Sequence, residues 1–184
     1  LVTQVGLVLH AGTEEHPAYR SFRQKQEICT LNLANLSDLT GARSPSGRVY
    51  IVENEMVFTQ LCDRSGQFHS PLICTSGQPS VAALRLLDLL ARLFYSGDLD
   101  GRGLSIAAQL WGRYPKLFEP WHMAPDDYER CCSNVVLGET SRALLRGCAG
   151  TPLETSAAAV TSSGRAVYQE LLISQLEADL TETP

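Results

Sequence analysis

The sequence predicts an α/β domain built on a parallel sheet of about four strands, with helices on its flanks. The first observation is that short apolar runs alternate with stretches of helical periodicity. The four runs are Val49–Val52, 72–75, 93–95 and 117–121. The second observation is that these runs are continuously apolar, which is typical of strands buried on both faces of a parallel sheet. Because right-handed crossovers join such strands, the loops that lead from strand to helix should share one edge.

The first 48 residues form a less regular lead-in to this predicted core, which we place at residues 49–180. Residues 5–9 are a first apolar run, and the β-rich run at 28–33 predicts a strand. Residues 19–27 predict a helix with a basic face, and residues 36–39 predict a single helical turn. A Ser-Pro-Ser-Gly loop at 44–47 then leads into the core.

Helices are predicted at 56–62, after Ser80, after Asp100 and from Pro125. The helix after Ser80 should turn Val81, Leu84, Leu87, Leu90 and Ala91 inward. Towards the C-terminus we expect a helix at 135–146 and a small-residue loop at 147–163. A terminal helix at 164–180 should bury Val167, Leu171, Leu172, Leu176 and Leu180 on one face.

Composition limits the protein class and the partners. With 184 residues, of which 44% are hydrophobic and 19% charged, the chain fits one globular domain. It contains neither a long apolar run nor a signal segment, so we expect a cytoplasmic protein without membrane contact. The six cysteines form no C-x-x-C pair, which favours reduced thiols. The net charge of −5 repels DNA, so a DNA-handling domain would need metal ions or partner subunits to offset it.

Three acidic residues follow predicted strands. Glu53 follows the first core strand, and Asp98 and Asp100 follow the third. Two side chains that stand two residues apart on an extended backbone point the same way and can share one cation. The alternative is an Asp- and Gly-rich turn with a helix cap. The shared edge favours a metal site, because it brings Glu53 towards the pair.

Other polar residues near this edge each have two interpretations. Glu55 and Glu170 are possible fourth acids, although Glu55 also suits a helix start. Ser76, Gly77 and Ser80 could bind a phosphate or DNA at a helix start, or could form an ordinary cap. Arg102 could contact a DNA phosphate or pair with an acid, and His122 is either an acid–base group or, more simply, a packed side chain.

Several motifs carry a resemblance to a known family. They are residues 49–54 (VYIVEN), 73–80 (ICTSGQPS), 95–100 (YSGDLD), 101–107 (GRGLSIA), 120–123 (PWHM) and 166–170 (AVYQE). An acid after one strand and an Asp-x-Asp after a later one resembles the Toprim domain. Together the motifs resemble the C-terminal domain of the JetD family, the nuclease subunit of Wadjet systems, whose Toprim domain is similar to that of the topoisomerase VI A subunit. The resemblance covers residues 49–180.

The resemblance implies a function and a set of site residues. It implies a Mg²⁺- or Mn²⁺-dependent DNA endonuclease that acts in plasmid defence as a homodimer, with an SMC-type, condensin-like complex delivering double-stranded DNA. Glu53, Asp98 and Asp100 would be its catalytic and metal-binding residues, with Glu170 as a further ligand. Topoisomerase-type enzymes carry a nucleophilic tyrosine on a helix-turn-helix domain that we do not find here, so water is the expected nucleophile. The alternative is a module that binds a nucleotide or a partner without chemistry.

Overall fold

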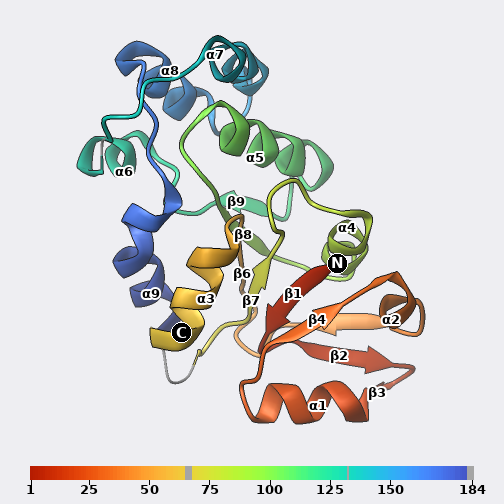
Figure 1. Ribbon diagram of the computed structural model, residues 1–184. Helices are drawn as coiled ribbons and strands as arrows, with labels where there is room; N and C mark the ends of the chain where they lie inside the picture. The colour runs from red at the N-terminus through yellow and green to blue at the C-terminus, as the bar shows by residue number, and fades with distance from the viewer. Residues whose placement is uncertain (65–67, 132, 182–184) are drawn as a thin grey trace.

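A six-stranded sheet lies at the centre of the computed structural model, which describes residues 1–64, 68–131 and 133–181 (Figure 1). The strand order is β4-β1-β7-β6-β8-β9. Four neighbouring strands are parallel: β6 (Val49–Val52), β7 (Leu72–Cys74), β8 (Leu93–Ser96) and β9 (Phe118–Pro120). They coincide with the four apolar runs, so the predicted α/β fold with a parallel sheet is confirmed.

Residues 1–48 extend this sheet and add a second, smaller one. β1 (Val2–Val5) pairs antiparallel with β7, and β4 (Cys29–Leu31) pairs antiparallel with β1. β3 (Glu14–Glu15), β2 (Val8–Ala11) and β5 (Gly41–Arg43) form the three-stranded sheet, accompanied by α1 (Pro17–Gln24) and α2 (Leu33–Ser37). The apolar run at 5–9 is divided between β1 and β2, because Gly6 has a φ of +86° and turns the chain. The division of the chain at residue 49 stays a prediction.

Helices cover both faces of the parallel strands (Figure 1). Val49 and Ile51 of β6 join one core with α4 (Val81–Leu87) and α5 (Gly101–Arg113). Tyr50 and Val52 point to the other face and join a second core with α3 (Glu55–Arg64) and α9 (Ile173–Thr181). Since side chains alternate along a strand, β6 is buried on both faces. Chemistry at this sheet is therefore confined to the ends of its strands.

The inward face predicted for the helix after Ser80 is partly wrong. α4 ends at Leu87, which is buried as expected, and Leu90 is buried beyond the helix. Val81, however, is 69% exposed, and Ala91 is exposed as well. The helix is shorter than expected, so its inward face consists of Ala82, Ala83, Leu86 and Leu87.

The C-terminal third differs most from its prediction. After α6 (Pro125–Arg130), the helix expected at 135–146 is limited to α7 (Glu139–Leu145), which η1 (Arg146–Cys148) follows. The loop expected at 147–163 is wrong, because α8 (Glu154–Ser163) occupies most of it and buries Ala157 and Val160. Gly164, with a φ of 68°, ends α8. The expected terminal helix is η2 (Gln169–Leu172) followed by α9, and Leu171 is 50% exposed.

Two expectations about chemistry and environment concern the whole chain. Cys29, Cys62, Cys74, Cys131 and Cys148 are free thiols, whereas Cys132 lies outside the described residues. Within the described ranges, no helix is long and apolar enough to cross a membrane.

Candidate active site

The candidate site lies at the edge where the parallel strands end. Glu53 follows β6, Ser76 and Gly77 follow β7, and Asp98 follows β8. The chain leaves β6 for β7 on one side of that strand and later returns to β8 on the other side. In open α/β sheets, ligands bind at the carboxyl ends of the strands where the strand order reverses in this way. Glu53 and Asp98 follow the two strands that flank this reversal.

Glu53 is a buried acid that faces a second acid. Its side chain is 9% exposed, and its carboxyl group accepts a hydrogen bond from the backbone N–H of Asp98. Burial, followed by the negative charge of Asp98, raises the pKa of Glu53 from 4.5 to about 7. Within the described part of the chain, the Oε2 atom of Glu53 is buried without a well-aligned hydrogen bond. This carboxyl group is therefore poorly stabilised as an anion by the protein alone.

Asp98 is half-buried and is also affected by nearby negative charges. Its Oδ1 atom accepts a hydrogen bond of 2.8 Å from the backbone N–H of Gln169. The pKa of Asp98 is raised from 3.8 to about 6, mainly by burial and also by the charges of Asp100 and Glu170, while the Gln169 hydrogen bond lowers it. A cation between Glu53 and Asp98 would relieve the repulsion at both carboxyl groups.

Asp100 has a different role from Asp98. It is the N-cap of α5, and its Oδ1 atom accepts a hydrogen bond of 2.8 Å from the backbone N–H of Gly103. The intervening Leu99 is fully buried and exchanges two backbone hydrogen bonds with Val167, of 2.8 and 3.1 Å. The helix-cap interpretation of the Asp-x-Asp pair therefore describes Asp100, whereas Asp98 lines the pocket together with Glu53.

Gly97 makes room for the Glu53 carboxyl group. A Cβ atom at this position would lie 2.8 Å from Oε2 of Glu53 and 3.1 Å from the hydroxyl oxygen of Tyr95. The Tyr95 side chain is fully buried, and burial, followed by the charges of Glu53 and Asp98, raises its pKa well above the usual range. Its hydroxyl group interacts with the Glu53 carboxyl group, which contributes to the raised pKa. Among the described residues, neither this hydroxyl nor that of Ser96 forms a well-aligned hydrogen bond.

Unpartnered polar atoms gather at this edge. Buried side-chain atoms without a hydrogen bond within the described residues include four from this region: Glu53 Oε2, Tyr95 OH, Ser96 Oγ and Gln169 Nε2. Each such group loses its water contacts on folding without compensation, and native proteins rarely tolerate several together. Their concentration beside two facing carboxyl groups fits a region that binds a polar ligand or an ion.

A pocket of about 520 Å³ opens in front of the two acids. Its lining comprises Glu53, Asn54, Glu55, Met56, Ser76, Gly77, Asp98 and Arg102. Arg102 lowers the pKa of Glu53 through its positive charge and, among the described residues, forms no ion pair. Its Nη2 atom comes within 3.7 Å of the position that a Cβ on Gly77 would take. The pocket thus joins three carboxyl groups, those of Glu53, Glu55 and Asp98, to the guanidinium group of Arg102.

The residues expected to bind a phosphate are only partly brought together. Ser76 and Gly77 line the pocket and have φ angles of 55° and 84°, but the N–H of Gly77 already donates to the Glu53 carbonyl oxygen at 2.9 Å. Ser80 lies outside this pocket. Its hydroxyl group accepts from the backbone N–H of Ala83 as the cap of α4 and donates to the carbonyl oxygen of Leu1. The cap interpretation therefore describes Ser80.

Glu170 and His122 occupy contrasting positions. Glu170 accepts a hydrogen bond of 2.7 Å from Nδ2 of Asn54, directly after Glu53, and contributes to the raised pKa of Asp98. His122 follows β9 but does not line the pocket. Its ring lies between Asp127 at 3.4 Å and Asp179 at 3.1 Å, as expected of a packed histidine.

The acids fit a hard divalent cation that keeps part of its water shell. Within the described residues, no group of three or more His, Cys, Asp or Glu side chains is placed to hold a metal ion by itself. Mg²⁺ needs less than such a group, because it commonly binds through one or two carboxylates and retains several waters. The facing carboxyl groups of Glu53 and Asp98 and the unpartnered Oε2 supply oxygen donors of this kind.

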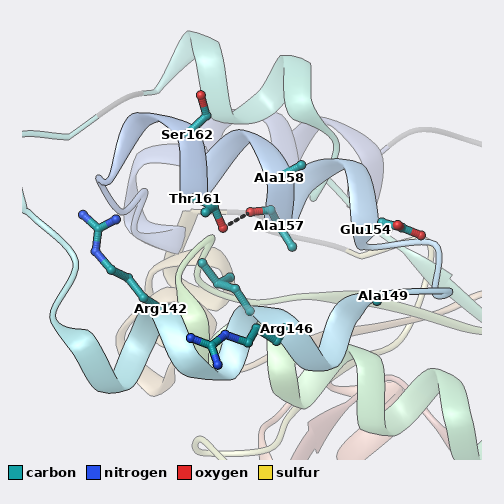
Figure 2. Close-up of a pocket in the computed structure, with 9 residues that line it drawn as sticks. Arg142, Arg146, Ala149, Glu154, Ala157, Ala158, Thr161 and Ser162 are labelled. Atoms are coloured by element: carbon teal, nitrogen blue, oxygen red, sulfur yellow. Dashed lines mark hydrogen bonds between the residues drawn. The ribbon is translucent and has the colours of Figure 1, made fainter.

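A second pocket, of about 480 Å³, lies between α7 and α8 (Figure 2). Arg142 and Arg146 line it from α7 and η1, and Glu154 lines it from α8. The Oε2 atom of Glu154 is bound by the backbone N–H of Gly150. None of the acids at the sheet edge reaches this pocket. It therefore lacks the facing carboxyl groups that distinguish the candidate site.

Sequence reasoning missed four residues that shape the site: Asn54, Tyr95, Gly97 and Gln169. Each one stands within or beside a motif named above, but its contact depends on a segment that is distant along the chain or on the local packing. Only Asn54 carried a usable signal, because it follows Glu53 directly.

The comparisons with known proteins place the chain in a family. Residues 29–180 match a family described as "Protein of unknown function C-terminus (DUF2399)". No curated protein matches the sequence. Since the matched residues make up most of the chain, this protein belongs to the DUF2399 family.

Proposed function

We propose that this chain is the Toprim-type catalytic domain of a metal-dependent DNA endonuclease, similar to the JetD nuclease subunit of Wadjet systems. One observation carries the proposal. Glu53 and Asp98 follow two adjacent parallel strands and line the same pocket, and the pKa of both carboxyl groups is raised, to about 7 and about 6. Two acids that repel each other at a ligand-binding edge are typical of a site that is completed by a cation.

The proposed reaction is hydrolysis of a phosphodiester bond. Bound Mg²⁺ or Mn²⁺ would neutralise phosphate oxygens and make a water molecule easier to deprotonate. Glu53 and Asp98 would hold the metal, and the Oδ2 atom of Asp100 is the oxygen that capping leaves available. Glu170 would contribute from η2, where Asn54 orients its carboxyl group.

Glu53 also suits the role of general base. A base works best when its pKa lies near the operating pH, and the pKa of Glu53 is about 7. In this role, which is the alternative to direct metal binding, Glu53 would accept the proton of the attacking water.

DNA binding requires help from outside this domain. The net charge of −5 repels a polyanion, and Arg102 supplies the local positive charge beside the acids. We propose that Arg102 contacts a phosphate, with Ser76 and Gly77 beside it in the lining of the pocket. An SMC-type, condensin-like complex would deliver double-stranded plasmid DNA in the cytoplasm, and a homodimer would cut both strands.

One observation favours a non-catalytic alternative. Asp100 and Ser80 cap helices, and the Gly77 N–H is occupied, so part of the polar edge stabilises the fold. A module that binds a nucleotide or a partner could use the same edge without hydrolysis. Cleavage distinguishes the two functions.

The experiment compares plasmid cleavage by the wild type, Glu53→Gln and Asp98→Asn, with Mg²⁺ or Mn²⁺ and the condensin-like partner present. We expect the wild type to linearise the plasmid and both variants to lose at least about a hundredfold in rate. Asp126→Asn, at an exposed acid in the first turn of α6, is the matched control and should cut normally. Circular dichroism checks that each variant is folded. Wild-type rates in Glu53→Gln and Asp98→Asn would refute the proposal, and a wild type that binds nucleotide but never cuts would favour the alternative.

A further inference from the structure

The segment before α9 returns to the candidate site from far along the sequence. Val167 exchanges two backbone hydrogen bonds with Leu99, which places the next residues beside the Asp98 loop. Gln169 is the first residue of η2 and is fully buried. A buried glutamine in this position needs hydrogen-bond partners, and it finds them in the loops that carry the two acids.

Gln169 contacts both loops at once. Its backbone N–H donates to Oδ1 of Asp98 at 2.8 Å, and its Oε1 atom accepts from the backbone N–H of Asn54 at 3.2 Å. Because the Asn54 partner is a donor, the amide oxygen must face it, and the orientation of the side-chain amide is fixed. Gln169 thus connects the residue after Glu53 to Asp98 through two hydrogen bonds.

A second connection runs parallel to the first. Glu170 accepts from Nδ2 of Asn54 at 2.7 Å, and Oδ1 of Asn54 accepts from the backbone N–H of Met56 at the start of α3. The Nε2 atom of Gln169 is buried without a partner among the described residues, as is Oε2 of Glu53. These contacts hold the two loops at a defined spacing while leaving polar atoms uncommitted.

We propose that Gln169 is a positioning residue that sets the spacing between the Glu53 and Asp98 carboxyl groups for one divalent cation. This inference rests on the proposed metal-dependent function. It assigns to the 167–170 segment the role of holding the loops that carry Glu53 and Asp98 next to each other. Replacing a residue that hydrogen-bonds a metal ligand, without binding the metal itself, commonly weakens metal affinity by about tenfold to a hundredfold.

Gln169→Met is the informative variant, because it keeps the side-chain length and the backbone N–H to Asp98 but removes the acceptor for Asn54. The chain offers a matched control. Gln4 in β1 is also buried, and its Oε1 atom accepts from the backbone N–H of Leu7 at the same distance of 3.2 Å. Gln4→Met therefore removes an equivalent hydrogen bond that does not touch the acids.

Titration calorimetry with Mn²⁺ measures the cation affinity of the three proteins. We expect Gln169→Met to weaken Mn²⁺ binding by about tenfold or more and Gln4→Met to change it by less than about twofold, with a similar loss of melting temperature in both. If the wild type binds Mn²⁺ and Gln169→Met binds equally well, the inference is wrong while the proposed function stands. Equal weakening in both variants would also overturn it, because a general loss of stability would then explain the effect.

If the wild type does not bind Mn²⁺, the proposed function is contradicted and the inference fails with it. Amide hydrogen exchange tests separately whether Gln169 couples the two loops. In Gln169→Met we expect faster exchange of the backbone N–H of Asn54, which loses its acceptor. We also expect faster exchange of the backbone N–H of Leu99, which donates to Val167 in the 167–170 segment. Faster exchange at Asn54 alone would show that the two loops are independent, and the positioning role would be refuted.

Discussion

The raised pKa of Glu53 makes the stability of this protein depend on pH in a direction opposite to that of most acids. Burial and the charge of Asp98 raise this pKa from 4.5 to about 7. Between these values the folded state binds more protons than the unfolded state, so the free energy of unfolding falls as pH rises. At about 1.4 kcal/mol per pKa unit, the Glu53 contribution amounts to roughly 3 kcal/mol across this range. Asp98, with a pKa of about 6, acts in the same direction, and the two carboxyl groups titrate as a pair.

Glu53→Gln removes this dependence while keeping the shape of the side chain. We expect the free energy of unfolding of the wild type to fall, relative to that of the variant, by roughly 3 kcal/mol between about pH 4 and about pH 8. Urea unfolding at a series of pH values measures the difference. Parallel pH profiles for the two proteins would refute the reasoning, because they would mean that Glu53 titrates normally in the folded state.

Further predictions concern the packing, the cap and the cation of the site. Gly97→Ala should destabilise the fold by about 1–3 kcal/mol and weaken Mn²⁺ binding, because the added Cβ would meet the Glu53 carboxyl group. Gly112→Ala is the control: its Cβ meets nothing, so the variant should stabilise α5 by up to about 1 kcal/mol. Equal effects of the two substitutions in thermal unfolding would contradict the steric argument for Gly97. Ser80→Ala should cost about 1 kcal/mol in urea unfolding by removing the α4 cap, with Mn²⁺ affinity unchanged; a loss of affinity would place Ser80 in the site. Arg102→Ala should weaken DNA binding and reduce the magnitude of the slope of log affinity against log salt concentration by about one. Fluorescence anisotropy measures both, and an unchanged slope would argue against a phosphate contact.

The acids of the site could be predicted because they depend on a local rule. Glu53 and Asp98 each follow a continuous apolar run, and parallel strands bring such positions to one edge. The different role of Asp100 could not be settled in this way. An Asp before a helix start is compatible with both a cap and a ligand, and only the hydrogen bond to Gly103 distinguishes them.

Residues that act across long sequence separations could not be predicted. Gln169 reaches Asp98 and Asn54 because Val167 pairs with Leu99, and no periodicity in the sequence records that pairing. α8 was missed because its Ser, Thr and Ala residues have the composition of a loop, whereas burial of Ala157 and Val160 favours the helix.

The central claim is that Glu53 and Asp98 hold one divalent cation between them. Crystals of the chain grown with Mn²⁺ test it most directly, because the anomalous scattering of Mn²⁺ locates the ion without reference to activity. The account predicts an anomalous peak within about 2–2.5 Å of carboxylate oxygens of both Glu53 and Asp98, and its loss in Asp98→Asn. A peak elsewhere, or none at saturating Mn²⁺, would contradict the account.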